Sequence, residues 1–423
     1  MTCETGDPST WWAVWRRYMF ATPVNVRGCV FPCPFLILQT IPRAKYPALS
    51  EAEEALSIPL QVLCLALFDV VLVHLLSSVM PARTWQPLKW SLHRALYEDK
   101  EVSCVAVLKQ HYAYADVIFV QEASEKFAAR AWACLEFCVL RPARSDGRRS
   151  QMSLIMLRLD RFVEASARDL TGEVLDLLPS KCVEKGDLCV FQALSHDGRP
   201  FLLASFHGDS GGRATCPVLA AIQRLAQEQY PAHTLVLGLD ANTAARRSPE
   251  AALDVAEFLA FLAGRGLASC WSGRPLDGVW TTFSARTHLQ PQLHKAVSHA
   301  RVLEGRNTQL KDWIVFSEAQ AACRSVEVDN TGRRAFVHGV IPSQTFPSDH
   351  AIVAAVLETR PEAPGPAAAA SLAGSFFDTG GGQAGDAGVG GLGGLRLLPA
   401  SGRSRKASRR APAVPPAPAA PGR

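Results

Sequence analysis

Residues 234–243, TLVLGLDANT, decide how the rest of the sequence is interpreted. Five apolar or small residues, Leu235 to Leu239, are followed by Asp240, Ala241 and Asn242. A short apolar run bounded by polar residues is typical of a buried strand rather than a helix. Because side chains alternate along a strand, Asp240 and Asn242 point the same way at its carboxyl end. The stretch predicts an acceptor and a donor side by side at a loop, although the same residues also begin ordinary Asx turns.

Four further predicted strands carry polar side chains of metal-binding or acid–base type at one end. These strands are DVIFV (116–120), FLLASF (201–206), DWIVF (312–316) and AIVAAVL (351–357), and the residues at their ends are Glu122, His207, Asp312, Asp349 and His350. Taken alone, each of these residues is typical of an ordinary polar side chain at the protein surface. Because ligand sites in α/β proteins collect at strand ends, we expect these side chains and the Asp240–Asn242 pair to share one pocket.

Helical patterns alternate with these strands. They cover residues 93–111, 216–228 and 251–262, and the run 88–92 predicts a further, first strand. Interleaved helices and strands indicate an α/β domain, which we place at residues 81–358.

Charge is concentrated at the carboxyl end of the chain. Residues 359–423 hold eight Lys and Arg against three acids, whereas residues 1–358 balance at 36 against 36. A neutral core lacks the bulk signature of a nucleic-acid-binding protein, although a local basic patch remains compatible with it. Residues 359–423 are also rich in Ala, Gly and Pro, which predicts a disordered tail. Its basic cluster, GRSRKASRR (402–410), has four open interpretations: binding of anionic lipid, binding of RNA, a nuclear signal, or a solvated flexible run with no such role.

Twelve cysteines are scattered along the chain without a CxxC pair or a Cys/His ligand spacing. The pattern predicts reduced thiols in an intracellular protein, cytoplasmic or nuclear, with no disulfide-linked partner.

The amino-terminal part divides at a long apolar run. Residues 1–57 give no clear structural pattern, and residues 58–80 form an apolar segment long enough to span a bilayer. Asp69 near its centre would cost about 2.5–3.5 kcal/mol on insertion scales. The sequence therefore leaves a membrane span and a buried helix open. Acids before the segment and bases after it favour a cytosolic carboxyl side if it spans.

The ordered motifs resemble those of the endonuclease/exonuclease/phosphatase superfamily of metal-dependent phosphodiesterases. The motifs, in the family's order over about 81–358, are VQE with Glu122, FHGDS with His207, GLDAN with Asp240 and Asn242, DWIVF with Asp312, and PSDHAIV with Asp349 and His350. The resemblance implies a two-sheet β-sandwich flanked by helices, a four-layer α/β sandwich. One departure is clear: in LKWSLHR, Ser91 stands where the family usually has Asn.

The resemblance also implies roles for these residues. Glu122 and Asp349 would hold Mg²⁺, with Mn²⁺ as a substitute, because carboxylate oxygens suit both ions. Asp240, oriented by Asn242, would take a proton from the attacking water. Asp312 would fix the ring of His350, and His207 would donate a hydrogen bond to the phosphate or the leaving group.

The substrate is the least determined feature. Residues 279–295, between GLDAN and DWIVF, lie where relatives place substrate-contacting loops, and Arg286, His288 and Lys295 are candidates for phosphate contacts. An RNA-directed, deadenylase-like nuclease is the first interpretation. The rival is a sphingomyelinase-type lipid phosphodiesterase or another phosphatase of the same superfamily, and the neutral core and residues 58–80 favour the lipid enzyme. A catalytically weak scaffold is a third, for which Ser91 is the only support.

Overall fold

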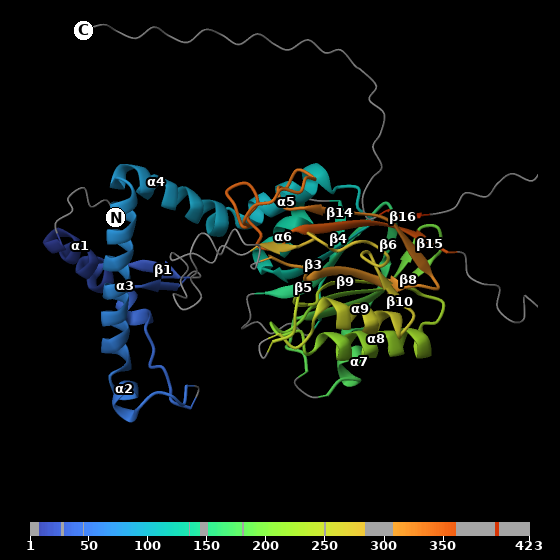
Figure 1. Ribbon diagram of the computed structural model, residues 1–423, viewed down its shortest axis with the longest axis horizontal. Helices are drawn as coiled ribbons and strands as arrows, with labels where there is room; N and C mark the ends of the chain where they lie inside the picture. The colour runs from blue at the N-terminus through green and yellow to red at the C-terminus, as the bar shows by residue number, and fades with distance from the viewer. Residues whose placement is uncertain are drawn as a thin grey trace, which may run out of the picture.

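The computed structural model describes residues 8–26, 29–44, 46–134, 136–143, 151–179, 182–248, 251–283, 308–360 and 394–396. Figure 1 shows two parts: an amino-terminal group of helices, and a larger part in which strands are stacked between helices.

One layer of the larger part is a six-stranded sheet. Its order is β10 (Leu267–Ser269), β13 (Asp312–Ser317), β9 (Thr234–Asp240), β8 (Pro200–His207), β7 (Leu188–Ser195) and β6 (Phe162–Asp169). β8 and β9 are parallel and are joined through α8 (Thr215–Gln229), whereas the other neighbours are antiparallel. A helical crossover is the usual way to join parallel neighbours, so the sequence between β8 and β9 fits this geometry.

A second layer faces this sheet and is built from two separate groups of strands. One group is β4 (Phe137–Leu140), β5 (Met152–Arg158) and β3 (Val117–Ala123), and the other is β14 (Ala321–Asp329), β15 (Ile352–Thr359) and β16 (Gly394–Arg396). β16 lies within the predicted disordered tail; residues 361–393 and 397–423 lie outside the described residues. A short pair, β11 (Thr282–Phe283) with β12 (Thr308–Gln309), lies beside the start of β15, where Thr282 bridges to His350.

Helices cover the outer faces of both layers (Figure 1). α7 (Thr171–Asp176), α8 and α9 (Val255–Ala263) lie on the six-stranded sheet, and α5 (Lys100–His111) and α6 (Glu125–Cys134) lie on the other side. The predicted two-sheet sandwich flanked by helices is confirmed.

The two sheets pack closely where β3 crosses β9. A Cβ atom on Gly238 would lie only 2.4 Å from the ring of Phe119, so this position in β9 requires glycine. The same contact explains why the strand TLVLGLD contains a glycine between large apolar residues, although glycine weakens an isolated strand.

The predicted strand 88–92 is wrong in this structure. Those residues belong to α4 (Ala82–His93), which is followed by one π-helical turn, η2 (Arg94–Glu98), and then by α5. Apolar and polar residues alternate in this run, as they do in a strand. A strand also needs neighbouring strands to bond its backbone, whereas a helix satisfies its own N–H and C=O groups locally. The predicted helix 93–111 begins with the last residue of α4 and then covers η2 and α5.

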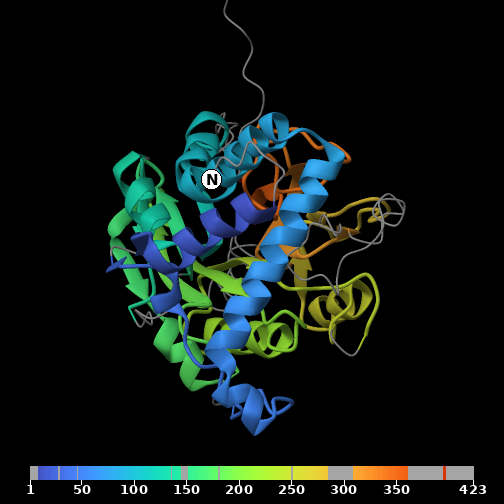
Figure 2. The same cartoon turned by 90° about the vertical axis from the view of Figure 1, so that its left-hand side faces the viewer.

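The amino-terminal part contains the apolar segment as a single helix. Its elements are α1 (Pro8–Ala21), β1 (Val24–Val26), β2 (Cys29–Phe31), η1 (Pro34–Ile37), α2 (Glu51–Ala55) and α3 (Ser57–Val79). α3 is long and apolar enough to cross a membrane, and only Ser57 and Ala66 of it are buried. α1 packs against it through Trp15 and Met19, and Figure 2 shows the two helices crossing.

Asp329 at the end of β14 ties the second layer to α5. One carboxylate oxygen accepts hydrogen bonds from the backbone of Thr331 and Gly332 at 2.8 and 2.9 Å. The other accepts from the backbone of Arg334 at 2.9 Å and from the hydroxyl of Tyr112 at 2.7 Å. Burial alone would raise the pKa of Asp329, but these donors outweigh it and hold the pKa below its usual value.

We expect Asp329→Asn to lower the free energy of unfolding at pH 7 by about 1–3 kcal/mol, because buried donors lose a charged acceptor. Since the folded pKa is depressed, the stabilisation is present above the unfolded pKa of about 3.9 and is lost as pH falls through the folded value. Urea unfolding of the wild type and the variant between pH 7 and pH 2.5 measures this. Asp160→Asn, at an exposed carboxylate, is the control; a gap independent of pH would contradict the account.

Candidate active site

The strand pairing of the six-stranded sheet gathers three polar residues at one edge. Asp240 ends β9, and its Cα lies opposite His207 of parallel β8 and opposite Asp312 of antiparallel β13. The second layer contributes Glu122 from β3 and His350, which directly precedes β15. All except His207 line one cavity together with Asp349.

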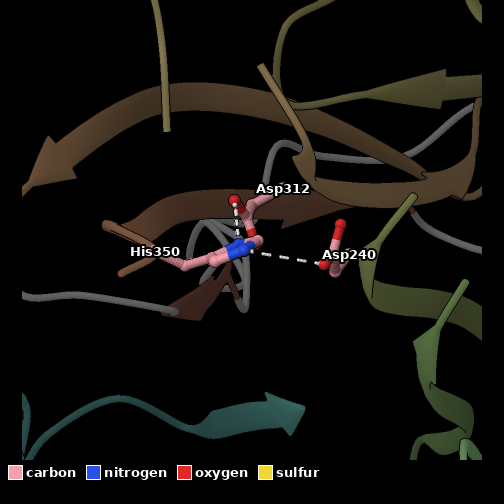
Figure 3. A group of neighbouring side chains, drawn as sticks. All are labelled: Asp240, Asp312 and His350. Carbon is pink, nitrogen blue, oxygen red and sulfur yellow. Dashed lines mark hydrogen bonds and ion pairs between the residues drawn. The ribbon is translucent and has the colours of Figure 1, made fainter. Parts of the chain in front are cut away.

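Five side chains form a row in which carboxylates and imidazoles alternate. Glu122 Oε1 lies 3.4 Å from His207 Nε2, and that nitrogen lies 3.7 Å from Asp240 Oδ2. The same Asp240 oxygen lies 3.7 Å from His350 Nε2, whose other nitrogen, Nδ1, lies 3.0 Å from both oxygens of Asp312. Figure 3 shows His350 between the two aspartates. Residues separated by more than 200 positions therefore meet in one site.

His350 is held as a hydrogen-bond donor. Burial alone would lower the pKa of His350, but the charge and hydrogen bond of Asp312, with Asp240 and Asp349 nearby, raise it to about 10. Its Nδ1 is committed to Asp312, which leaves Nε2 facing Asp240 and the cavity. A fixed ring with one free N–H suits recognition of an anionic oxygen.

His207 is similarly surrounded by carboxylates. Burial opposes its protonation, but Asp187, Asp240 and Glu122 together raise the pKa of His207 above its ordinary value. Its Nδ1 lies 3.9 Å from Asp187 Oδ1. Sequence reasoning did not select Asp187; its only signal was its place in a turn directly before the apolar strand β7.

Asp240 and Asn242 are both buried and locally fixed. The backbone N–H of Asn242 donates to Asp240 Oδ1 at 2.9 Å, so the ordinary Asx turn is present. The Asn242 amide donates to the Gly208 carbonyl at 2.9 Å and accepts from Lys311 Nζ at 2.6 Å. Burial raises the pKa of Asp240, although the neighbouring His350 opposes the shift. A carboxylate with a raised pKa and one free oxygen suits a general base.

Two of these residues have strained backbones. Glu122 and Asn242 have positive φ angles of 54° and 50°, a region that residues other than glycine rarely adopt. Such conformations persist where the surrounding structure enforces them, and they cluster at functional sites. At the ends of β3 and β9, the backbone therefore adopts an unfavourable conformation that sets the direction of the side chain.

The donor set fits a hard divalent cation. Glu122 Oε2 accepts from Gln151 Nε2 at 3.2 Å, which orients this half-exposed carboxylate, and Asp349 lies exposed at the same cavity. Asp240, Asp312 and His350 also offer ligand atoms within 4.8 Å of one another. Asp312 and His350 are hydrogen-bonded to each other, so they are less available to a metal ion than the carboxylates of Glu122 and Asp349. Mg²⁺ prefers oxygen ligands of this kind.

The structure does not test every predicted site residue. Arg286, His288 and Lys295 lie outside the described residues. Ser91, predicted to lie in a strand at the position where the family usually has Asn, lies exposed on α4 with its hydroxyl 3.5 Å from Gln344 Nε2. Sequence reasoning also did not select Lys311, the contact of Asn242, because a lysine before a strand carries no signal of its own.

Comparisons with known proteins found one matching family and several similar solved structures. Residues 2–90 match a domain of unknown function (DUF8234), and no curated protein sequence matches the chain. Similar solved structures include D. rerio TDP2 complexed with single strand DNA product, with 15% identity, 62% of this chain and 92% of that chain covered, and a TM-score of 0.42. A second is the human nocturnin catalytic domain with bound sulfate anion, with 15% identity, 64% of this chain and 89% of that chain covered, and a TM-score of 0.41.

A third similar structure is an endonuclease/exonuclease/phosphatase family protein from Bacteroides thetaiotaomicron, with 17% identity, 60% of this chain and 87% of that chain covered, and a TM-score of 0.39.

We expect Asp312→Asn to lower the pKa of His350 from about 10 toward the ordinary value of about 6.5, because the largest charge holding its proton is removed. NMR titration of the ring protons measures this, with His350→Gln used to assign the signal. Asp277→Asn, at an exposed acid, is the control. An unchanged titration in Asp312→Asn would contradict the assigned pairing.

Proposed function

We propose that the chain is a divalent-metal-dependent phosphodiesterase whose substrate is RNA. The observation that carries the proposal is the alternating carboxylate–imidazole row from Glu122 to Asp312, delivered by strands of both sheets. A phosphodiester is anionic and resists attack by water, so its hydrolysis needs a base for the water and donors for the phosphate oxygens. The row supplies both.

The roles follow from the contacts. Asp240 accepts the proton of the attacking water through Oδ2, because Oδ1 already accepts the backbone N–H of Asn242. His350 donates Nε2–H to a phosphate oxygen, since Asp312 holds Nδ1. His207 donates to the phosphate or the leaving oxygen from the Glu122 side of the row. A positioned general base contributes about 10²–10⁴-fold to such a reaction.

Glu122 and Asp349 would hold Mg²⁺, with Mn²⁺ as a substitute. The ion would neutralise phosphate charge and stabilise the leaving oxygen. Two carboxylates suffice for Mg²⁺, which keeps several waters in protein sites.

RNA as the substrate is supported by two features of the sequence. The motif set resembles that of nocturnin-like and deadenylase-like enzymes, and the basic cluster at 402–410 adds positive charge to a chain whose remainder is neutral. The scattered, unpatterned cysteines support an intracellular location, where such a substrate is found.

We expect Asp240→Asn and His350→Ala each to reduce Mg²⁺-dependent hydrolysis by at least about 10²-fold while the far-UV circular dichroism is unchanged, because each removes one catalytic group from a rigid site. Hydrolysis is measured on RNA, DNA, sphingomyelin and nucleotide phosphates, with and without a chelator. Glu228→Gln, on the exposed face of α8, is the control. Normal turnover in either variant would reject the assignments, and cleavage of another substrate alone would reject RNA.

The second candidate is a membrane-bound lipid phosphodiesterase, which α3 favours. Its 23 residues extend about 34 Å at 1.5 Å per residue, enough to cross a hydrocarbon core of about 30 Å. Large apolar side chains such as Leu63, Leu67 and Val71 are exposed. Asp69 is not isolated: the indole N–H of Trp15 donates to its Oδ2 at 2.9 Å, which reduces the cost of placing it in lipid.

We expect the full chain to float with neutral phosphatidylcholine vesicles on a density gradient and Leu67→Arg to float less, because a charge on the exposed face of α3 opposes insertion. Leu159→Arg, at an exposed leucine of the larger part, should float as the wild type does. A wild-type chain that stays at the bottom of the gradient would reject the proposal that the protein binds membranes. Sphingomyelin hydrolysis in the floating fraction, without RNA hydrolysis, would favour the lipid candidate.

A further inference from the structure

Two strands of the second layer, β3 and β15, have an edge that lacks a partner strand among the described residues. β3 pairs only with β5, so its other edge is free. β15 pairs with β14 along its whole length, but on its opposite edge β16 covers only Val356–Glu358. The edge at 352–355 is therefore also unpaired. Free strand edges carry rows of N–H and C=O groups that bind another strand readily.

These two edges face each other across a cavity of about 530 Å³. Consecutive residues 117–124 of β3 and its end, and 346–354 before and along β15, line it. Because alternate residues of a strand point to opposite faces, a lining of consecutive residues means that the strands meet the cavity with their edges. Residues of α5 close one side, and residues of β9 and β13 close the other.

One segment of the chain has the pattern of the missing strand. In Leu88–His93, LKWSLH, apolar and polar residues alternate strictly, which is the period of a strand. In α4 this pattern leaves Leu88, Trp90 and Leu92 all exposed. Pro87 lies inside the same helix, where proline removes a hydrogen bond and disfavours helical geometry. The helix thus buries none of the apolar residues that the segment offers.

The connection to α5 allows the segment to enter the cavity. The amino-terminal turn of α5 lies at the catalytic end, because Glu101 accepts a hydrogen bond from Ser124, just beyond β3, at 3.0 Å. Leu96, Tyr97 and Lys100, which precede or begin α5, already line the cavity. A strand at 88–92, followed by α5 and then β3, would make a parallel β–α–β unit, and a helical crossover is what such neighbours require.

We propose that the cavity is the binding site for the segment Pro87–His93, which enters as a strand parallel to β3 and antiparallel to β15. Entry joins the two halves of the second layer into one sheet and buries the apolar residues that α4 exposes. In the structure described here the segment lies outside the cavity, as part of the helix α4. Since Glu122 and His350 lie at the ends of the two strands that the segment would bridge, its entry fixes the spacing between the two ends of the catalytic row.

The occupancy of the cavity is tested by photo-crosslinking, independently of any activity. Benzoylphenylalanine replaces Trp90 in the full chain, and the adducts are located by mass spectrometry. Replacement of Trp132 on α6 is the matched control, because both tryptophans are 59% exposed. We expect the probe at position 90 to form adducts on residues 117–123 and 351–355, and the probe at position 132 to form none there. Adducts elsewhere only, or none, would overturn the proposal.

A cavity-filling variant gives a second readout. Ile118→Trp occupies the space beside β3 and should abolish the adducts from position 90 on β15. Its effect on hydrolysis rests on the proposed function, and there we expect a loss of at least tenfold. Persistent adducts on β15 in Ile118→Trp would contradict entry between the strands. Adducts without any hydrolysis in the wild type would leave entry established and reject only the enzymatic proposal.

Discussion

The site depends on the position of β9 between β8 and β13. This pairing sets Asp240 opposite His207 on one side and opposite Asp312 on the other, with a parallel and an antiparallel neighbour in register. Backbone hydrogen bonds thus determine the spacing of three functional side chains before any of their own contacts form. A slip of one residue in either pairing would turn a whole strand over and remove its polar end from the site.

Packing between the two sheets adds the remaining members of the row. Phe119 of β3 lies against Gly238 of β9, so the end of β3 is held near the end of β9. Glu122 then reaches His207, and His350 reaches both aspartates. The carboxylates and the imidazoles of the row stabilise one another, because the carboxylate charges raise the pKa values of both histidines.

The sequence predicted the strands that carry this row because each has a short apolar run with a polar end, a local signal. It predicted the convergence only through the combination of motifs, since no local pattern records which strands become neighbours. Asp187 and Lys311 could not be predicted for that reason, because Asp187 contacts His207 and Lys311 contacts Asn242 only once the strands are neighbours. The segment 88–92 shows the opposite case, in which the local pattern indicates a strand and the observed backbone is helical.

The amino-terminal part bears on the site through the same segment. α3 exposes its apolar surface, and α4 follows it directly and leads through η2 into α5, whose first turn lies at the cavity. Only α4 and η2 therefore separate α3 from the helix that begins at the cavity. The region matched by the domain of unknown function is therefore connected along the chain to the candidate active site.

The central claim is that carboxylates and imidazoles from both sheets form one cation-binding, phosphodiester-cleaving centre. Paramagnetic broadening by Mn²⁺ of the assigned ring protons of His207 and His350 tests it most directly, since the ion would be bound beside both rings. The account predicts that substoichiometric Mn²⁺ broadens both signals in the wild type, and that Glu122→Gln requires a much higher concentration. Equal broadening of all exposed histidines, or sharp signals from these two, would contradict it.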